Sequence, residues 1–498
     1  MTYCLRDYEK ALKECGLLLK STVKDNLKVT GLTFDSREVA TGTLFICKGA
    51  AFKREYLDMA EEKGAIACVS GTEYSDFPCI TVSDIRRAMA VLANMYYDEP
   101  WKKLKLTGFG GTKGKSTSAY YMKAITDDYM KATGGKESAI ISSIDTYDGV
   151  IREESHITTP EAVELQMHLA NAVQSGITWA QMEISSQALK YDRVAEMRFD
   201  VGVFLNISED HISPLEHQDF DDYFNSKMMM FPITDTAAVN LDCDLACKVL
   251  ERAESAKKVV TFSRQDEGAD YFAYDIKKLG HGSSFRIRHG DFDGEFTLTM
   301  PGLFNVENAL GAAAAACELG IPWEYIRSGL ERARSGGRME LYSSADGNII
   351  AIVDYAHNKL SFETLFSSMA AEYPGYNMVA VFGCPGKKAL SRRRDLGTIA
   401  GRYSKKVIIT AEDPGEEPFA GISHEIEQYV HSAGASCEII EDRGQAIKRA
   451  IDTAEGKTII LITGKGRETR QKYGREYIPC PSDVDYATRY LAEYDGRV

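Results

Sequence analysis

A glycine-rich segment near residue 110 contains residue types at a spacing that suits phosphate binding. Residues 108–117 read Gly-Phe-Gly-Gly-Thr-Lys-Gly-Lys-Ser-Thr, between an apolar run at 104–109 and a helical pattern at 118–126. Glycines let successive backbone N–H groups face phosphate oxygens, and the N-terminus of the following helix adds a favourable dipole. Lys115 would neutralise β- and γ-phosphate charge, and the Ser116 hydroxyl would bind Mg²⁺. The segment predicts a site for a nucleoside triphosphate.

One position departs from the strict phosphate-loop pattern. That pattern requires a glycine five residues before Gly114, where this chain has Phe109. The alternative is a glycine-rich turn that exposes a lysine. Strand, loop and helix nevertheless follow in the order that the motif requires, which favours nucleotide binding.

The elements that would position this loop belong to an α/β fold. Apolar, β-branched runs alternate with turns and helical patterns, and in the last third chemically reactive residues follow successive runs. This indicates a doubly wound, mainly parallel sheet with ligand loops at the carboxyl ends of its strands. The expected strands are residues 42–47, 65–70, 104–109, 178–184, 201–207, 259–262, 349–353, 378–382, 406–410, 437–440 and 458–463.

Composition excludes some classes of function. A chain of 498 residues predicts about three domains. The net charge of −14 disfavours a nucleic-acid-binding surface. No apolar run is long enough to span a bilayer, and the charged residues throughout 1–20 do not resemble a signal peptide. The 11 cysteines are scattered, which favours reduced thiols over metal or disulfide roles. We expect a cytoplasmic monomer with no nucleic-acid partner and no membrane insertion.

A series of short motifs resembles the Mur ligase family. Each motif is weak alone, but together they cover nearly the whole chain in the family's order. The resemblance implies three α/β domains: a small UDP-binding domain at 1–101, a central P-loop-type ATPase domain at 102–336, and a Rossmann-like amino-acid-binding domain at 337–498. Besides the glycine-rich loop, the motifs are Asp-Ser-Arg at 35–37, Thr-Thr-Pro at 158–160, Glu-Ile-Ser-Ser-Gln-Ala-Leu at 183–189, Asn-Ile-Ser-Glu-Asp-His at 206–211, Gly-Leu-Phe-Asn at 302–305, Gly-Arg-Met-Glu at 337–340, Asp-Tyr-Ala-His at 354–357 and Gly-Lys-Gly-Arg-Glu at 464–468.

The resemblance also implies an ADP-forming ligase of peptidoglycan synthesis, and hence a role in cell division and cell shape. Such an enzyme adds an amino acid to UDP-N-acetylmuramoyl-L-alanyl-D-glutamate through an acyl phosphate. Its cofactors would be ATP and two Mg²⁺ ions, one bound by Ser116 and Glu183 and the other by His211. Lys227 would carry a CO₂-derived carbamate near the second ion. The helical pattern around Lys227 alone would instead give a solvated lysine, and His211 alone would be read as structural.

Family positions give a set of expected site residues. For Ser185 and Ser186, a polar strand end remains the alternative to substrate contact. The resemblance assigns catalysis to Lys115, Glu183, His211, Lys227 and His357; ATP binding to Gly111, Thr112, Lys113, Gly114, Lys115, Ser116, Thr117, Asn305, Arg338 and Asp354; and the muramoyl nucleotide to Asp35, Ser36, Arg37, Thr158, Thr159, Ser185, Gln187 and Arg193.

The added amino acid is predicted from residues 412–415, which read Glu-Asp-Pro-Gly. The branch that adds meso-diaminopimelate has Asp-Asn-Pro-Arg, whose arginine can hold the distal carboxylate with two hydrogen bonds. Here Glu412 and Asp413 favour a distal ammonium instead, with Gly464 and Glu468 in the same site. We therefore expect L-lysine, with ornithine and meso-diaminopimelate as alternatives.

Two further features of this region stay open. Glu416 and Glu417 fit a role in capping and solvating the loop. One of the three arginines at 392–394 would hold the α-carboxylate of the incoming amino acid. The rival functions are a folylpolyglutamate synthase-like ligase and a non-catalytic, Mur-like protein that binds nucleoside triphosphates.

Overall fold

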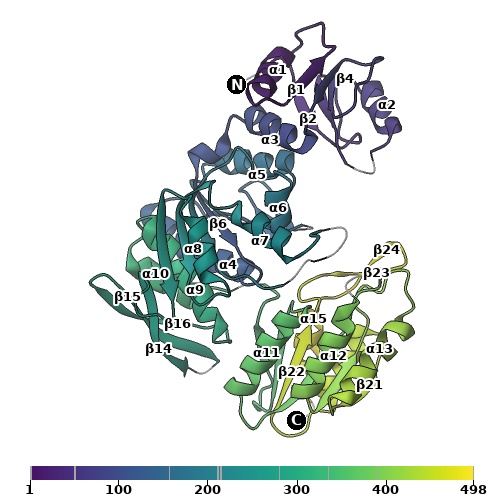
Figure 1. Cartoon of the computed structure of the whole chain (residues 1–498). Helices are drawn as coiled ribbons and strands as arrows, with labels where there is room; N and C mark the ends of the chain where they lie inside the picture. The colour runs from purple at the N-terminus through teal and green to yellow at the C-terminus, as the bar shows by residue number, and fades with distance from the viewer. Residues whose placement is uncertain are drawn as a thin grey trace. The chain divides into compact units, whose positions relative to one another are not determined.

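The structure, a computed structural model, describes residues 3–49, 52–155, 157–209, 212, 216–279, 281–334, 336–387 and 390–496. It divides into two compact units, Met1–Tyr271 with Gly311–Gly329, and Phe272–Leu310 with Leu330–Val498. Each unit is described by itself (Figure 1). All eleven cysteines are free thiols.

The first unit begins with a five-stranded sheet in the order β1-β5-β4-β3-β2, in which only β1 runs antiparallel to its neighbour. Helix α1 buries Leu5, Tyr8 and Leu12 against this sheet, at the spacing expected of one helix face. The elements are α1 (Leu5–Glu14), β1 (Leu18–Ser21), β2 (Gly31–Thr33), β3 (Thr43–Cys47), α2 (Arg54–Glu62), β4 (Ala65–Ser70), β5 (Cys79–Val82), α3 (Ile85–Tyr96) and the 3₁₀ turn η1 (Pro100–Lys103).

A larger sheet follows, with strand order β13-β12-β11-β6-β10-β7-β8-β9 within this unit. Strands β13 to β7 are parallel, and β8 and β9 extend the edge as an antiparallel hairpin. The central strand β6 therefore has parallel neighbours on both sides. The elements are β6 (Lys105–Gly110), α4 (Lys115–Thr133), β7 (Ala139–Ile141), β8 (Asp145–Tyr147), β9 (Arg152–Glu154), α5 (Ala162–Gln174), β10 (Trp179–Glu183), α6 (Ser186–Lys190), β11 (Phe199–Phe204), α7 (Phe220–Met228), β12 (Thr234–Asn240), α8 (Ala246–Ala253) and β13 (Lys258–Ser263).

Three strands that the sequence did not predict form an antiparallel meander, β14 (Tyr271–Leu279), β15 (Gly282–His289) and β16 (Phe292–Leu298). Alternate side chains are buried along β15, among them Phe285 and Ile287. Helices α9 (Phe304–Glu318) and α10 (Trp323–Arg332) follow, and the division between the two units passes through both.

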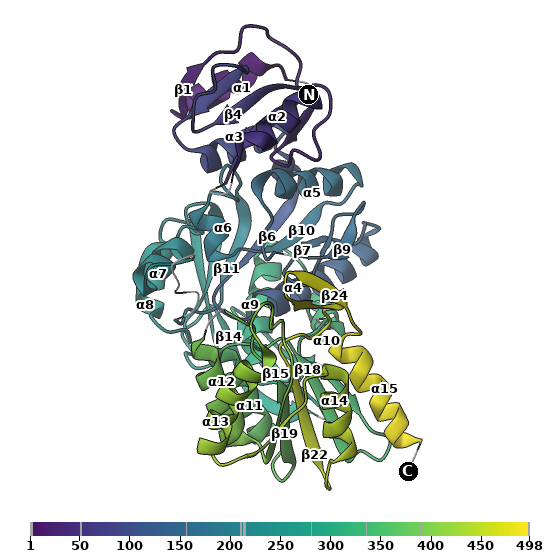
Figure 2. The same ribbon diagram turned by 90° about the vertical axis from the view of Figure 1, so that its right-hand side faces the viewer.

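The second unit contains a six-stranded sheet in the order β17-β18-β22-β19-β20-β21, parallel except for β17. Helices α11–α13 pack against one face and α14 and α15 against the other (Figure 2). This is the predicted doubly wound arrangement. The elements are β17 (Glu340–Ser343), β18 (Ile349–Asp354), α11 (Lys359–Glu372), β19 (Asn377–Phe382), α12 (Ser391–Tyr403), β20 (Lys406–Ile409), α13 (Phe419–Ser432), β21 (Ser436–Ile439), α14 (Arg443–Asp452), β22 (Thr458–Thr463), β23 (Arg470–Tyr473), β24 (Glu476–Pro479) and α15 (Asp483–Asp495).

The predicted α/β class is confirmed, and every expected strand is present. Two limits differ. The helix expected at 118–126 begins three residues earlier and runs on to Thr133, and the strand expected at 201–207 ends at Phe204. The earlier helix start places Lys115 and Ser116 in its first turn, where backbone N–H groups lack helical acceptors.

Candidate nucleotide and amino-acid sites

The glycine-rich segment connects strand β6 to helix α4 through residues 111–114. Gly111 has a φ of +140°, and a Cβ atom on it would lie 3.1 Å from Cβ of Leu205 and 3.2 Å from the backbone nitrogen of Asn206. Gly114 also has a positive φ, 83°, directly before the helix. These conformations favour glycine and bring the loop against the end of β11.

The departure at Phe109 has a structural reason. Phe109 lies inside β6, and its side chain is fully buried. Its backbone carbonyl accepts a hydrogen bond of 2.8 Å from the backbone N–H of Ile184. The strand thus continues two residues further than the strict motif assumes, and the loop begins at residue 111.

The side chain of Asn206, just after β11, forms hydrogen bonds with the backbone of the loop. Its Oδ1 accepts hydrogen bonds from the backbone N–H groups of Thr112, at 3.1 Å, and Lys113, at 2.8 Å. Its Nδ2 donates to the carbonyl of Lys113 at 3.1 Å. Sequence reasoning quoted Asn206 within a motif but gave it no role. Because these two N–H groups are occupied, the amides left to face phosphate are those at the start of α4.

Lys115 bends back over the loop. Its Nζ donates to the carbonyl of Gly111 at 3.0 Å and to the carbonyl of Thr112 at 3.1 Å. The ammonium group therefore lies at the mouth of the loop, where a phosphate chain would need positive charge.

Ser116 and Glu183 are brought together by Ser143, which sequence reasoning missed. The hydroxyls of Ser116 and Ser143 lie 3.1 Å apart, and Ser143 donates its N–H and its hydroxyl to Oε1 of Glu183 at 2.7 and 3.0 Å. Glu183 is 1% exposed and has no ion-pair partner within the described part of the chain. A buried carboxylate without a counter-charge is unfavourable. Together with the serine hydroxyls, its hard oxygen atoms fit Mg²⁺.

Lys227 lies at the same loop. It is 3% exposed, which excludes a solvated helix lysine. Its Nζ donates to the carbonyl of Gly111 at 2.7 Å and lies 4.7 Å from the ring centre of Tyr223. The hydroxyls of Tyr223 and Thr112 are 3.0 Å apart, so α7 is held against the loop. The other predicted metal ligand, His211, lies outside the described residues.

Several residues predicted to contact the muramoyl nucleotide form hydrogen bonds or ion pairs with one another or with their neighbours. The Thr159 hydroxyl donates to the carbonyl of Glu183 at 2.9 Å, and Ser185 caps α6 by accepting from the N–H of Ala188 at 3.1 Å. Arg193 donates to the carbonyl of Thr159 at 3.1 Å and pairs with the Glu161 carboxylate at 2.8 Å. The Ser185 hydroxyl thus has a structural partner in the chain, and its contact with substrate stays a prediction. Ser186 is likewise engaged, 2.9 Å from Nε2 of His217. Thr158 and Gln187 are half-buried, and their side chains form no hydrogen bond with the described residues.

At Asp35–Arg37 the two charged side chains bond to each other. The Nε–H of Arg37 donates to Asp35 at 2.9 Å, and this hydrogen bond is the main reason that the pKa of Asp35 falls to about 2. Ser36 is buried. A missed residue, Lys48, pairs with Glu161 at 2.6 Å and so links β3 to the segment that contains Thr159.

In the second unit, Asp354 ends β18 and orders the backbone around Arg338. It accepts from the N–H groups of Met339, at 2.9 Å, and Ala356, at 2.7 Å. The guanidinium of Arg338 lies 4.8 Å from the ring centre of Tyr355. Nδ1 of His357 lies 2.7 Å from the Tyr355 carbonyl. These predicted ATP and catalytic positions are adjacent.

Asn305, the predicted adenine contact, is 1% exposed. Its Nδ2 donates to the carbonyl of Pro301 at 2.6 Å, and its Oδ1 accepts from Asn308 at 3.1 Å. Both ends of the amide therefore have partners in this conformation, so an adenine contact would require one of these hydrogen bonds to be exchanged.

The predicted amino-acid residues converge where β20 and β22 end. Nζ of Lys465, a residue that sequence reasoning did not assign, lies 3.0 Å from Asp413 and 2.5 Å from Glu468. Tyr355 donates to Glu468 at 2.5 Å. A Cβ atom on Gly464 would lie 2.2 Å from Oε2 of Glu412, so only glycine leaves room for that carboxyl group.

Glu412 is the most perturbed of these acids. Burial raises its pKa to about 7, although Arg443, Lys465 and Arg392 act to lower it. The buried Arg443 is itself paired with Asp483 at 2.6 Å, so it offers Glu412 only part of its charge. A cationic ligand beside Glu412 would favour the ionised form.

The neighbouring acids and arginines separate into paired and available groups. Glu417 pairs with Arg393 at 2.7 Å, and Arg393 also pairs with Glu425 at 2.8 Å. Arg394 pairs with Asp395 and is largely exposed. Arg392 is half-buried and forms no hydrogen bond or ion pair within the described residues. Glu416 pairs with Lys387 and Arg475. Both Glu416 and Glu417 therefore form ion pairs that hold the loop, the structural role predicted for them.

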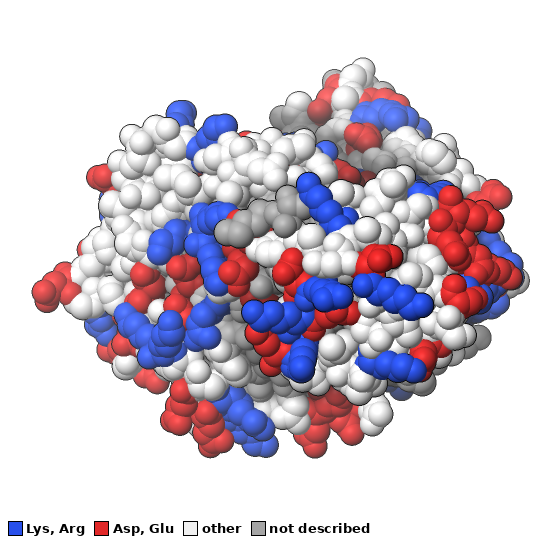
Figure 3. All heavy atoms as spheres, turned by 90° about the horizontal axis from the view of Figure 1, so that it is seen from above, with Lys and Arg blue, Asp and Glu red and all other residues white. Residues whose placement is uncertain are grey.

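Two properties of the surface bear on partners. On the face that Figure 3 shows, lysine and arginine side chains are intermixed with aspartate and glutamate. Among the described residues, no helix is both long enough and apolar enough to cross a bilayer.

Comparisons with known proteins agree on one family. Residues 110–316 match the model of the Mur ligase middle domain, and residues 337–466 match that of the Mur ligase, glutamate ligase domain. The chain is 36% identical to the UDP-N-acetylmuramoyl-L-alanyl-D-glutamate--L-lysine ligase of Streptococcus agalactiae serotype Ia, over 94% of this chain and 93% of the relative. It is also 36% identical to the ligase of the same name from Enterococcus faecalis, with 94% of each chain covered.

A solved structure shares the fold over the whole chain. The structure of a UDP-N-acetylmuramoyl-L-alanyl-D-glutamate--2,6-diaminopimelate ligase superposes with a TM-score of 0.69 at 23% identity, covering 99% of both chains. The domain models, the full-length relatives and the shared fold agree with the loop geometry: the chain belongs to the Mur ligase family.

Proposed function

We propose that this protein is a MurE-type ligase that adds L-lysine to UDP-N-acetylmuramoyl-L-alanyl-D-glutamate, with conversion of ATP to ADP and phosphate. The observation that carries the choice of lysine is the group of three carboxylates at 412, 413 and 468: Asp413 and Glu468 share Lys465, and Arg443 beside Glu412 is already paired with Asp483. Gly415 stands where an arginine would favour a second carboxylate on the added amino acid. The printed names of the relatives point to the same amino acid.

Arg392 is the proposed partner of the α-carboxylate. Arg393 and Arg394 already have acidic partners, whereas the side chain of Arg392, which lies near Glu412, forms no ion pair with the described residues. In this arrangement Arg392 would bind the carboxylate and the acids would bind the distal ammonium, so the amino acid would enter in one orientation.

The chemistry follows from the charges that the nucleotide loop gathers. The D-glutamyl carboxylate attacks the γ-phosphate, the resulting acyl phosphate makes that carbonyl reactive, and the amine displaces phosphate. Lys115 would stabilise the transferring phosphoryl group, since charge develops there in the transition state. Ser116 and Glu183 would hold one Mg²⁺, which would neutralise phosphate oxygens. His211 and a carbamate on Lys227 would hold the second.

The muramoyl nucleotide would bind in the first unit. Thr158 and Gln187 support this, because their side chains are accessible and uncommitted. Asp35, Ser36 and Arg37 would contact the UDP part after the Asp35–Arg37 pair opens. Domains at 1–101, 102–336 and 337–498, a monomeric state and a cytoplasmic location remain part of the proposal, as do the roles in cell shape and division.

A competition assay tests the amino acid. The enzyme receives ATP, Mg²⁺, the UDP-dipeptide and equal amounts of L-lysine, L-ornithine and meso-diaminopimelate, and the products are separated by mass. We expect mainly the lysine product. Glu412→Gln should weaken lysine use, and the matched control Glu416→Gln should not, because Glu416 is exposed and paired with Arg475. Preference for meso-diaminopimelate would refute the lysine assignment.

Two further arms test the rival functions. ADP release that depends on a folate substrate would indicate a folylpolyglutamate synthase-like ligase. ATP binding with no ADP release for any amine would indicate a non-catalytic protein. For Lys227→Ala we expect loss of turnover and partial rescue by short-chain carboxylates, which can replace a carbamate; full activity of this variant would remove Lys227 from the site.

A further inference from the structure

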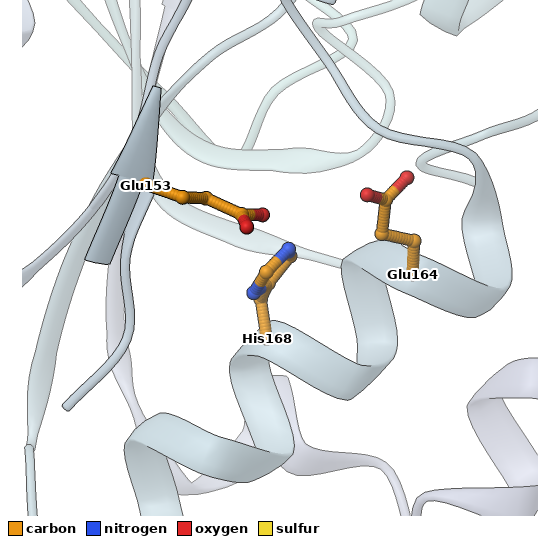
Figure 4. Close-up of side chains that lie close together, drawn as sticks. All are labelled: Glu153, Glu164 and His168. Atoms are coloured by element: carbon orange, nitrogen blue, oxygen red, sulfur yellow. The ribbon is translucent and has the colours of Figure 1, made fainter. Parts of the chain in front are cut away.

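Away from the nucleotide loop, three side chains converge on the edge of the larger sheet. Glu153 comes from β9, and Glu164 and His168 come from α5, one helical turn apart (Figure 4). One ligand atom from each lies within 4.8 Å of the others. In Figure 4 a ring nitrogen of His168 is directed into the space between the two carboxylates.

His168 is oriented for this position by a buried carboxylate. Its side chain is 2% exposed, and its Nδ1 lies 2.7 Å from Asp148, which is fully buried. Asp148 also accepts hydrogen bonds from the backbone N–H groups of Val150, at 2.9 Å, and Ile151, at 2.6 Å, and from Nδ2 of Asn171, at 2.8 Å. Burial opposes ionisation of Asp148, but these hydrogen bonds prevail and lower its pKa.

The tautomer of His168 follows from this contact. An ionised carboxylate can only accept, so Nδ1 must carry the proton that it donates to Asp148. In the neutral ring Nε2 then has a free lone pair, and it forms no hydrogen bond with any described residue. An imidazole whose other nitrogen is held by a carboxylate is the usual arrangement of a metal-binding histidine.

We propose that Glu153, Glu164 and Nε2 of His168 bind one divalent transition-metal cation of the Zn²⁺ class. One imidazole with two carboxylates suits Zn²⁺ and its neighbours, whereas Mg²⁺ prefers oxygen ligands alone. The two glutamates are exposed, so water can complete the coordination. A bound cation would offset the repulsion between the carboxylates of Glu153 and Glu164.

A cation at this site would constrain the neighbouring segment of the chain. Glu153 and Glu164 flank the segment that contains Thr158 and Thr159. A metal that joins them would clamp both ends of this segment and reduce the conformations open to it. Metal binding at this site does not depend on the proposed function. Only an effect of the metal on muramoyl-nucleotide binding rests on that proposal.

Equilibrium dialysis against Zn²⁺ tests the site. The full-length protein is stripped with a chelator and dialysed without substrates in excess Mg²⁺, which saturates all-oxygen sites. Wild type is compared with Glu153→Gln/Glu164→Gln, which keeps every cysteine and His168. The matched control is Glu154→Gln, an exposed carboxylate on the opposite face of the same strand. We expect wild type and the control to bind one Zn²⁺ more than the double variant.

Equal binding in wild type and the double variant would overturn the site, as would equal loss in the Glu154→Gln control. Hydrogen exchange tests the clamp: Zn²⁺ should slow exchange in residues 157–161 of wild type and of the Glu154→Gln control but not of the double variant. Unchanged exchange in the metal-bound wild type would overturn the clamp. Because neither measurement uses substrates, failure here leaves the ligase assay unaffected, and inactivity in that assay leaves the metal site unaffected.

Discussion

The nucleotide loop and the proposed amino-acid site are held in position by different kinds of interaction. The loop is fixed by backbone geometry and by hydrogen bonds from Asn206. The proposed amino-acid site is a network of charged side chains in which Lys465 pairs with both Asp413 and Glu468. Phosphate binding thus needs little change of the loop backbone, whereas a bound amino acid must exchange partners with groups that are already paired. Affinity for ATP should depend on the loop's shape, and affinity for the amino acid should depend on charge and pH.

Lys115→Met should give the largest effect. Removal of the positive charge at the mouth of the loop leaves the transferring phosphoryl group without a principal cation, so we expect kcat to fall by about 10³-fold. Steady-state ADP release measures this, and urea unfolding measures separately the loss of the two hydrogen bonds from Lys115 to the loop carbonyls. Activity within tenfold of wild type would show that the loop does not act on the γ-phosphate.

Arg392→Ala tests the charge network. Loss of a charge-assisted contact to the α-carboxylate should raise the KM for lysine by about 10- to 100-fold and leave the KM for ATP unchanged. Arg394→Ala is the matched control, because Arg394 is largely exposed and pairs with Asp395. An equal change in the KM for lysine in both variants would contradict the assignment of Arg392 to the α-carboxylate.

Asn206→Ala tests whether the loop is preformed. The variant leaves the N–H group of Lys113 without its Asn206 acceptor, whereas the N–H group of Thr112 keeps the backbone carbonyl of residue 206 at 3.0 Å. We expect this loss to lower stability by about 1–3 kcal/mol. We expect the KM for ATP to rise about tenfold and the KM for lysine to stay constant. Kinetics with each substrate varied in turn, together with urea unfolding, separate these effects; a change confined to lysine would contradict the comparison.

Glu412→Gln should have the smallest effect, visible as a change in pH dependence. The pKa of Glu412 is raised to about 7 in the folded protein, whereas a glutamate in the unfolded chain has its ordinary pKa near 4.5. Between these values the folded state holds the extra proton, so the free energy of unfolding contributed by Glu412 falls as pH rises. Urea unfolding from pH 4 to pH 8 should show this fall in wild type and a weaker fall in the variant.

Lysine binding should show the opposite trend. Affinity should rise a few-fold as pH increases through about 7, because the ionised Glu412 can then pair with the ammonium group. Direct titration with lysine in the absence of ATP measures this. A pH-independent affinity in wild type would remove Glu412 from the ammonium site.

Local patterns predicted much of the fold and of the loop. Every strand predicted from an apolar run is present, and the glycine spacing correctly predicted the loop between β6 and α4. The meander β14–β16 was missed, although the alternation at Phe285 and Ile287 was a usable signal. Ser143 and Lys48 carried no signal of their own, because their roles come from partners distant in the sequence.

The sequence alone determined the phosphate-binding chemistry, since glycine conformations and a helix start depend on a few consecutive residues. It also determined the acidic character of the amino-acid site, because residue types set charge. Only the tertiary structure decided how Asn206 holds a loop 94 residues away, which arginine is uncommitted, and how far burial raises the pKa of Glu412. These properties depend on burial and on contacts between segments far apart in the chain, and no local pattern specifies either.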